Sequence, residues 1–248
     1  MKRCTLLLLL IIEAFALRSQ EKLVVAAKDH ARKDVPVYIK LSRPHAVDDF
    51  WELQDSKTGK LLPAQLLDQV TLVFIPREEI AAGATATYVL KPTQRMTTPP
   101  VRVEEQKNGL LVTVGTKPLL FYNTSEALPP AGSADYYRRS GFIHPLYSPG
   151  GAILTDDFPA GHMHQHGIFM TWVNTTFRNK PVDFWNQHSQ TGTVQHVEVI
   201  SIKEGPVFTR IRTHLRHISL VDGPVLEEAW DLTIYPFSDH FLYDLESE

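Results

Sequence analysis

Short runs of alternating apolar and polar residues follow one another along the chain from about residue 21 onward. Runs such as KLVVAA, VPVYIKL, FWELQD, VTLVFIP and ATATYVLKP are rich in β-branched and aromatic residues, which favour strands. Helical periodicity is weak, and only REEIAAGA at 77–84 predicts a short turn of helix, which Gly83 would end. The pattern therefore predicts an all-β protein.

Turn signals separate these runs. DSKTGK at 55–60 predicts a hairpin turn. In VRVEEQKNGLLVTVG, Asn108 and Gly109 predict a tight hairpin bend, because Asn-Gly supplies the positive φ angles that such turns need. Further strands are expected at KPLLFYN, GIFMTWV, TVQHVEVISIK, VFTRIRTHLRHI, VLEEAWDLTIY and HFLYDLESE. Many short strands and seventeen prolines are typical of a β-sandwich.

A stretch rich in proline and threonine, KPTQRMTTPP at 91–100, has the composition of a linker. It predicts a small all-β domain over 21–95, expected as a β-sandwich, and a larger antiparallel β-sandwich over 96–248. The chain ends at FLYDLESE, which still has a strand pattern and no closing turn. The larger domain is expected either to end on an edge strand or to be truncated, and we favour truncation.

The N-terminus has the layout of a secretory signal peptide. Lys2 and Arg3 precede an apolar run that extends to Leu17, and the alanines near its end suit cleavage by a signal peptidase. The run is shorter than the roughly 20 apolar residues of a membrane-spanning helix. An uncleaved anchor is the alternative. We expect residues 1–20 to be removed and the protein to be exported, to the periplasm or outside the cell.

Composition narrows the classes of function. The chain has 248 residues, of which 43% are hydrophobic and 21% charged, and its net charge is -3. The absence of a basic excess argues against binding to nucleic acid or to an anionic membrane surface. The single cysteine, Cys4, lies in the predicted leader, so the mature chain would hold neither disulfides nor thiolate metal ligands. Its stability would then depend on the apolar core.

Six of the eleven histidines lie in one part of the chain, and three of them alternate in DDFPAGHMHQHGIFMTW at 156–172. A strand directs alternate side chains to one face, so we expect these three rings to point the same way. The surrounding segments are rich in Pro, Gly and Asn, and loops of this kind often carry binding or catalytic residues. The six histidines are His144, His162, His164, His166, His188 and His196.

One chemistry for this set is metal binding. Histidines two residues apart in a strand are roughly 7 Å apart at Cα, so His162 and His164, or His164 and His166, would form a ligand pair. The outer two would be roughly 13 Å apart, which is too far for one ion without a bend. A divalent ion would need a third ligand, for which His144, His188 and Asp183 are the candidates.

A second chemistry is proton transfer on a bound sugar. Histidine titrates at about pH 6.5, so it gives or takes a proton near neutrality. Aromatic side chains nearby would stack on the apolar faces of a sugar ring, while amides and a carboxylate bond its hydroxyls. The aromatic candidates are Tyr147, Trp172, Phe184 and Trp185, and the polar ones are Asp183, Asn186 and Gln187.

A third interpretation gives these residues no function. The histidines would be a partly exposed stripe, the tryptophans would belong to the core, and Asp156 and Asp157 would cap a turn. In EEAWDL at 227–232, alternation places Glu228 and Trp230 on one face of a strand. A carboxylate beside Trp could be an acid with a raised pKa, but charged residues that protect a sheet edge are the interpretation that we favour.

Four stretches together resemble a bacterial family that often carries the label "methane oxygenase PmoA" and is treated as a domain of unknown function. They are FIHPLYSPGG, LTDDFPAGHMHQHGIFMTW, DFWNQHSQTGTV and EEAWDLTIY, and the resemblance runs from about residue 140 to the end. Members often have Asp before the first histidine of the cluster, where this chain has Gly161. A methane oxygenase membrane subunit needs several spanning helices, and no apolar run of the mature chain is long enough. We therefore treat the label as a misnomer.

The resemblance implies an exported sandwich similar to that of galactose mutarotase, whose sites pair histidines with a carboxylate base. We expect a carbohydrate or keto-sugar to bind in a cleft lined by His and Trp, with no cofactor. If the protein is a sugar-acting isomerase, lyase or hydrolase, His162 and His164 would transfer protons, with His166 also a candidate. Supporting roles fall to His144, Asp183 and Asn186, and binding roles to Trp185, Trp172 and Tyr147. The alternatives are a non-catalytic carbohydrate-binding or structural protein, and a metal-dependent enzyme with His162 and His164 as ligands.

Overall fold

The protein is all-β, as the pattern of the sequence predicts. A computed structural model describes residues 21–94, 99–237 and 239–248. Antiparallel sheets account for its regular structure, and the helices of this part of the chain are two single 3-10 turns, η1 (Asp135–Tyr137) and η2 (Gln187–Ser189). The predicted leader and part of the predicted linker lie outside the described residues.

The N-terminal unit is one six-stranded antiparallel sheet that curls almost into a barrel, where a small two-sheet sandwich was expected. Its strand order is β1-β6-β3-β4-β5-β2, and its interior is filled by apolar side chains such as Leu53, Leu66, Leu72 and Phe74. The strands are β1 (Lys22–Ala26), β2 (Val37–Lys40), β3 (Trp51–Asp55), β4 (Leu61–Asp68), β5 (Thr71–Phe74) and β6 (Thr85–Pro92).

In this unit the sequence predicted a hairpin turn correctly, but it predicted a helix that does not form and missed one strand. The 55–60 turn joins β3 to β4 as expected, and the Asp55 carboxylate accepts hydrogen bonds from two backbone N–H groups inside it. The short helix predicted at 77–84 is wrong, because this segment crosses the sheet margin as bends and a turn, with Gly83 at a φ of +76°. Strand β4 was not recognised from the sequence, since Pro63 interrupts its pattern.

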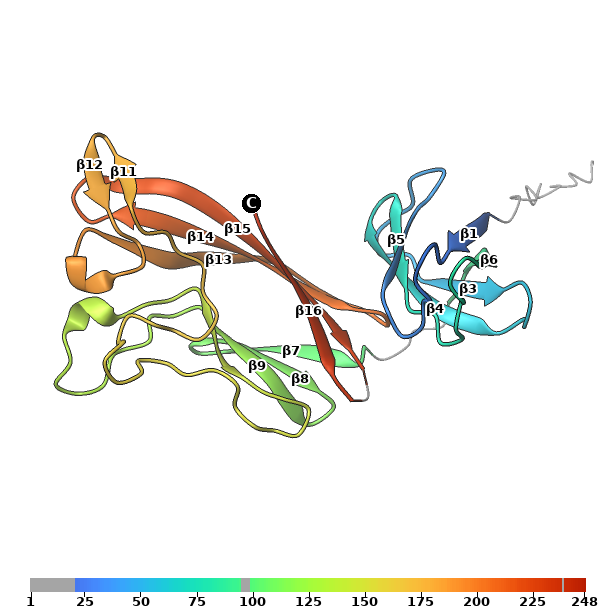
Figure 1. The fold of residues 1–248 in the computed structure, drawn as a ribbon, viewed down its shortest axis with the longest axis horizontal. Helices are drawn as coiled ribbons and strands as arrows, with labels where there is room; N and C mark the ends of the chain where they lie inside the picture. The colour runs from blue at the N-terminus through green and yellow to red at the C-terminus, as the bar shows by residue number, and fades with distance from the viewer. Residues whose placement is uncertain (1–20, 95–98, 238) are drawn as a thin grey trace, which may run out of the picture.

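The C-terminal part is a sandwich of two four-stranded antiparallel sheets, which Figure 1 shows as two layers on the side away from the six-stranded unit. A separate hairpin joins β11 (Thr175–Phe177) to β12 (Lys180–Val182). One sheet is β10 (Phe142–Leu146), β9 (Lys117–Asn123), β8 (Gly109–Val114) and β7 (Val101–Gln106). The other is β13 (Gly192–Glu204), β14 (Thr209–Ser219), β15 (Gly223–Pro236) and β16 (Phe241–Ser247).

The predicted hairpin between β7 and β8 forms, but its bend lies one residue earlier than expected. Gln106 pairs with Gly109, so Lys107 and Asn108 form the turn. Gly109 is needed for a different reason: a Cβ atom there would lie 2.1 Å from the carbonyl oxygen of Tyr122 on β9. The glycine therefore allows the close approach of a neighbouring strand.

Strict alternation along β14 decides which side chains enter the sandwich. Odd-numbered residues from Thr209 to Ser219 are buried, while the even-numbered positions are partly exposed and, except for Ile218, carry Arg or His side chains. His217 thus points into the sandwich. On the paired strand β15, Glu228 and Trp230 also point inward. The predicted strand GIFMTWV does not form, because only Ile168 makes a bridge, to Ile143.

A third apolar cluster joins the six-stranded unit to the sandwich. Val73 and Ile75 pack against Phe208 and Tyr235. The buried Gln65 side chain accepts hydrogen bonds from the backbone N–H groups of Val207 and Phe208. These contacts explain why the long strands β14 and β15 reach the six-stranded unit in Figure 1.

Candidate functional site

The three alternating histidines lie on a loop, so the strand predicted for them is wrong. Residues 156–167 form a hairpin-like loop that an Asp157–His166 bridge closes. Within it, the backbone N–H of His162 donates to Pro159, which gives a turn, and Gly161 has a φ of +81°. Proline and a left-handed glycine break the extended conformation, and the rings therefore do not share one face.

His166 is buried beneath this loop and does not face solvent. Its Nδ1 atom lies 2.7 Å from a carboxylate oxygen of Asp157, and its Nε2 atom lies 2.9 Å from Oε1 of Gln187. The Gln187 amide donates from its other end to the Arg138 carbonyl, which fixes its orientation. Both ring nitrogens of His166 therefore have a hydrogen-bonding partner, and the ring is held between Asp157 and Gln187.

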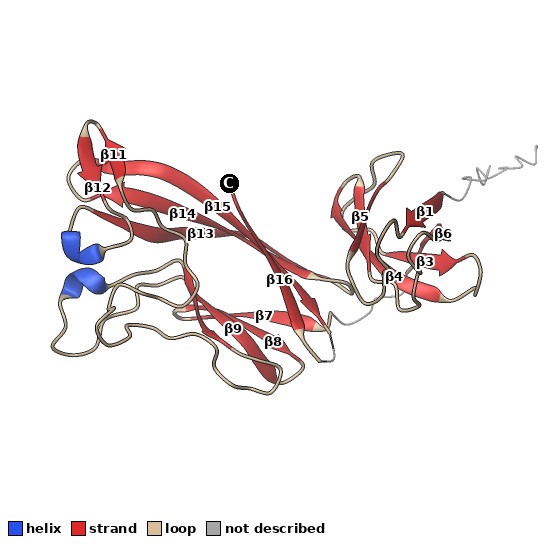
Figure 2. Cartoon of the chain, in the orientation of Figure 1, coloured by secondary structure: helices blue, strands red, loops and turns tan. Residues whose placement is uncertain are grey.

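The other histidines form a row at the surface. The ring centroids of His162 and His164 are 6.0 Å apart, and those of His164 and His188 are 5.9 Å apart, both in edge-to-face arrangement. His162 and His188 are exposed, and His164 between them is half-buried. His188 belongs to η2, which lies beside η1 at one end of the sandwich (Figure 2). The bond between Gln187 and His166 connects this helix to the loop.

Burial and neighbouring positive charge both lower the pKa of His164. Burial is the larger cause, and His188, His162 and His166 add to it, while Asp183 acts weakly in the other direction. Since the ordinary value is about 6.5, His164 is mostly neutral at pH 7. A neutral imidazole beside partly exposed neighbours can accept a proton or a hydrogen bond from a bound hydroxyl.

Asp183 and Asn186 shape the loop that carries His188. One oxygen of Asp183 accepts from the backbone N–H groups of Trp185 and Asn186, and the other accepts from the Asn186 side chain. Burial would raise the pKa of Asp183, but these hydrogen bonds outweigh it and lower the pKa. Both carboxylate oxygens are used within the loop, so Asp183 orients the neighbouring side chains.

Two aromatic rings connect this surface with a buried arginine. The Trp185 and Phe169 ring centroids are 4.9 Å apart, and the guanidinium carbon of Arg139 lies 5.0 Å from the Phe169 ring centre. Trp185 is half-buried. Of the other predicted aromatic residues, Trp172 is 54% exposed and Tyr147 is half-buried, and within the described chain neither has a ring contact with the histidines.

His144 lies next to the loop without joining the row. Its Cβ atom would be 2.9 Å from a Cβ built on Gly167, and its Nδ1 atom lies 3.0 Å from the Thr155 hydroxyl. Gly167 has a φ of +58°, and a side chain there would also collide with the Ile143 carbonyl. The chain therefore passes close to His144 at Gly167, but the His144 ring is engaged by Thr155.

The proposed third metal ligand does not join the histidine pair. In the part of the chain that the structure describes, no group of three or more His, Cys, Asp or Glu side chains is arranged to hold a metal ion. The rings of His162, His164 and His188 meet edge to face and do not converge on one point. This arrangement gives the metal hypothesis no support.

A buried acid and base were missed by the sequence interpretation. Oε2 of Glu228 lies 2.6 Å from Nε2 of His217, and its other oxygen accepts from the Trp230 indole and the Ser247 hydroxyl. Glu228 is 4% exposed, so it does not protect a sheet edge. Burial would raise its pKa, but the bonds from His217, Ser247 and Trp230 lower it. The alternation in EEAWDL did place Glu228 beside Trp230 on one face.

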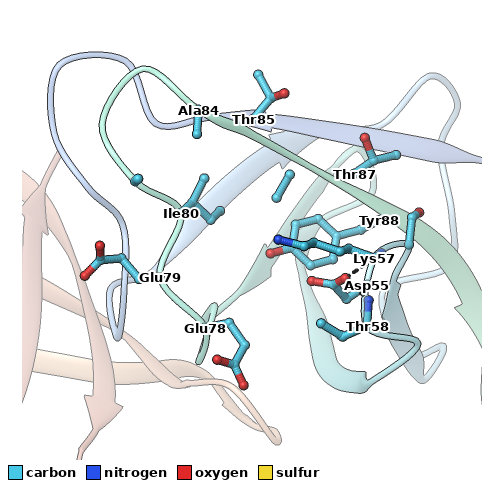
Figure 3. Close-up of a pocket in the computed structure, with 13 residues that line it drawn as sticks. Asp55, Lys57, Thr58, Glu78, Glu79, Ile80, Ala84, Thr85, Thr87 and Tyr88 are labelled. Carbon is cyan, nitrogen blue, oxygen red and sulfur yellow. Dashed lines mark hydrogen bonds between the residues drawn. The ribbon is translucent and has the colours of Figure 1, made fainter.

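A separate groove of about 740 Å³ lies on the six-stranded unit (Figure 3). The turn at 55–58 forms one wall and residues 78–88 the other, with Tyr88 at its base. Burial would raise the pKa of Asp55, but the backbone N–H groups of Thr58 and Lys57 lower it overall. The carboxylate of Asp55 is therefore used by the turn itself.

Comparison with known proteins places the chain in a family without a known activity. In the described residues, no helix has both the length and the apolar character needed to cross a membrane. No curated protein and no solved structure matches the chain. The model of a family of unknown function, DUF6807, matches residues 109–248, which contain the whole histidine-rich site. Since this match covers more than half of the chain, the protein is a member of the DUF6807 family.

Proposed function

We propose that this protein binds carbohydrate at the surface formed by His162, His164, His188 and Trp185. The row of three histidine rings, with the half-buried Trp185 on the same loop as His188, is the observation that supports this function. An indole face stacks on the apolar C–H side of a sugar ring, while imidazole nitrogens bond its hydroxyls. We call these four residues the histidine surface.

The hydrogen bonds that hold the loops of the histidine surface are those expected of a binding site. The buried His166 ring, bonded to Asp157 and Gln187, anchors the loop on one side, and Asp183 holds the other loop by its backbone. Side chains on loops that are held by buried hydrogen bonds lose little freedom when a ligand binds. The neutral state of His164 at pH 7 suits it to be a general base if the bound sugar also reacts.

The same proposal includes an exported location and a relation of the sandwich to galactose mutarotase. Residues 1–20 would direct export, and the ligand would be a small carbohydrate or keto-sugar met outside the cytoplasm. Fractionation of cells that express the full chain, followed by N-terminal sequencing, tests the location. A retained leader in the cytoplasmic fraction would contradict export without affecting the carbohydrate proposal.

A glycan array followed by titration calorimetry tests the binding. We expect Trp185→Ala to weaken binding about tenfold, because stacking on an aromatic face contributes roughly 1.4 kcal/mol. His164→Ala and His188→Ala should also weaken it. His30→Ala is the matched control, since His30 is an exposed histidine of the six-stranded unit. Absence of binding to every saccharide, or equal loss in His30→Ala, would exclude the proposal.

Turnover separates an enzyme from a binding module. Saccharides that bind are incubated with the protein, and NMR follows anomer exchange and product formation. An enzyme predicts exchange that His164→Ala abolishes while Trp185→Ala mainly raises KM. Binding without exchange or product identifies the protein as a non-catalytic carbohydrate-binding module.

A further inference from the structure

We propose that the sandwich contains a second site, beneath Phe184, that binds a carboxylate group between Arg139 and His217 and takes up a proton as it does so. This inference does not depend on carbohydrate binding at the histidine surface. It rests on two buried side chains that each have a polar atom without a protein partner in the described part of the chain, Nη1 of Arg139 and Nδ1 of His217.

Arg139 is a buried cation without a close counter-ion. It is 1% exposed, and among the described residues Glu228 is the one charged group that acts on it. Nη2 donates to the Phe184 carbonyl at 3.2 Å, while Nη1 has no partner there. Burial lowers the pKa of Arg139 to about 9, and Glu228 acts in the opposite direction from a greater distance. A buried cation of this kind is costly to keep unless an anion approaches it.

His217 has the geometry of a base that is ready to accept a proton. Its Nε2 atom donates to Glu228 at 2.6 Å, and Glu228 is held in turn by Trp230 and Ser247. This bond requires a proton on Nε2, and in the neutral ring Nδ1 then carries a lone pair. That atom is fully buried and without a partner in the described chain. Protonation there would turn Nδ1 into a donor.

Phe184 connects the two groups. Its ring packs edge to face on the His217 ring with 5.1 Å between centroids, and its carbonyl accepts from Arg139. Phe184 is 4% exposed and lies in the loop that also carries Trp185. The proposed carboxylate would lie beneath this residue, with the guanidinium on the side of its carbonyl and the imidazole on the side of its ring.

Charge balance predicts that His217 binds a proton when the carboxylate anion binds. Arg139, a neutral His217 and the Glu228 carboxylate sum to zero, so an added carboxylate would leave one uncompensated negative charge. Protonation of His217 removes that charge and satisfies both free atoms, because Nη1 and Nδ1 then both donate to the ligand. Two other titratable side chains on this side of the sandwich keep their protonation states. Burial strongly raises the pKa of Tyr122, on which Glu228 also acts, so Tyr122 stays neutral. Burial lowers the pKa of His196, which bonds Tyr122, so His196 also stays neutral at pH 7.

Titration calorimetry with acetate tests this site, with acetamide as the neutral isostere. We expect acetate to bind, acetamide to fail, and about one proton to be taken up when the heats in two buffers of different ionisation enthalpy are compared. Over the pH range in which binding takes up one proton, the affinity should fall by about tenfold for each unit of rising pH. Phe184→Ala should bind acetate at least as tightly, because Arg139 and His217 both remain and the covering ring is gone.

Variants at the two groups make the test specific. Arg139→Gln should abolish binding, and His217→Gln should abolish proton uptake while its amide still donates to Glu228. Arg138→Gln is the matched control, since the neighbouring Arg138 side chain forms ion pairs at the surface. If Arg139→Gln does not fold, the comparison of acetate with acetamide in Phe184→Ala replaces it.

The outcomes are distinguishable. No acetate binding in either the wild type or Phe184→Ala overturns the proposal, as does equal affinity for acetamide or binding without proton uptake. Glucuronate separates two sources of the carboxylate. If glucuronate binds and acetate does so equally, the site takes free carboxylates. If glucuronate binds far more tightly and Trp185→Ala weakens only glucuronate, the carboxylate belongs to a sugar that also reaches the histidine surface.

Discussion

The two interiors of this molecule are built differently. The six-stranded unit is filled by side chains such as Leu53, Leu66 and Leu72, which are fully buried and carry no polar atom. The sandwich has an apolar core of similar character, but Arg139, His217 and Glu228 are also buried in it. Both parts are antiparallel β-structures of one chain, so the difference lies in the residues that alternation turns inward.

This contrast indicates where function is to be sought. Apolar burial stabilises each interior at about 25 cal/mol per Å², without any buried charge. A buried ion pair rarely improves on well-packed apolar residues, because the cost of desolvation offsets the attraction between the charges. The charged groups of the sandwich therefore need a reason other than stability, and they lie directly behind the loops of the histidine surface. The six-stranded unit has the composition expected of a supporting domain.

The largest effect is expected from breaking the buried pair. Glu228→Leu leaves the His217 imidazole, the Trp230 indole and the Ser247 hydroxyl without their acceptor, and should reduce the free energy of unfolding by about 3–5 kcal/mol. Urea denaturation measures the change. The double variant Glu228→Leu/His217→Leu should recover a large part of the loss, because no unpaired partner remains. If Glu228→Leu is as stable as the wild type, the buried polar groups of the sandwich do not depend on Glu228 as an acceptor.

The apolar interior should respond through packing alone. Leu53→Ala removes a fully buried side chain from the six-stranded unit and should cost about 2–5 kcal/mol in urea denaturation. The cost should be the same at pH 5 and pH 8, since no titratable group is involved. Leu61→Ala is the control, because Leu61 on the same sheet is 51% exposed. A clear pH dependence of the Leu53→Ala effect would mean that the two interiors are not as different as the contacts indicate.

Strands with a strict alternation of apolar and polar residues were predictable from the sequence, while the partners that their side chains meet were not. Alternation in VFTRIRTHLRHI and EEAWDLTIY gave strands β14 and β15 and the face of Glu228, since side-chain direction in a strand follows from position. The partner of Glu228 could not be found in this way. His217 meets it only through the register of β14 against β15, which depends on the whole sheet.

In the histidine cluster, alternation predicted a strand that does not form. Alternation of His162, His164 and His166 resembled a strand, but Pro159 and Gly161 turn the chain, so that His162 and His164 lie in the surface row while His166 is buried. His188 joins the row from a loop more than twenty residues away, because Gln187 bonds to His166. The residue types indicated a site, but which histidines meet depends on hydrogen bonds that no local pattern encodes.

A smaller effect is expected at the base of the histidine surface. Asp157→Asn removes the carboxylate charge that faces Nδ1 of the buried His166 ring and should cost about 1–3 kcal/mol of unfolding free energy. Thermal unfolding measures this loss. Asp156→Asn is the matched control, since Asp156 is exposed and an amide oxygen can still accept from its neighbour's backbone N–H. Equal effects of the two variants would show that His166 does not depend on the charge of Asp157.

The smallest effect concerns the titration of His164. Its pKa is lowered by burial and then by His188, so His188→Gln should raise the NMR titration midpoint of His164 but leave it below 6.5, because burial remains. Just below pH 6.5 the unfolded chain binds more protons at this position than the folded protein does. The contribution of His164 to stability therefore falls as the pH drops through that window, and it should fall less in the variant. His30→Gln, far from the row, should leave the midpoint unchanged.

A midpoint of His164 that stays fixed or moves down in His188→Gln would show that the His164 and His188 rings do not interact. The histidine surface would then lose the contact that joins its two loops.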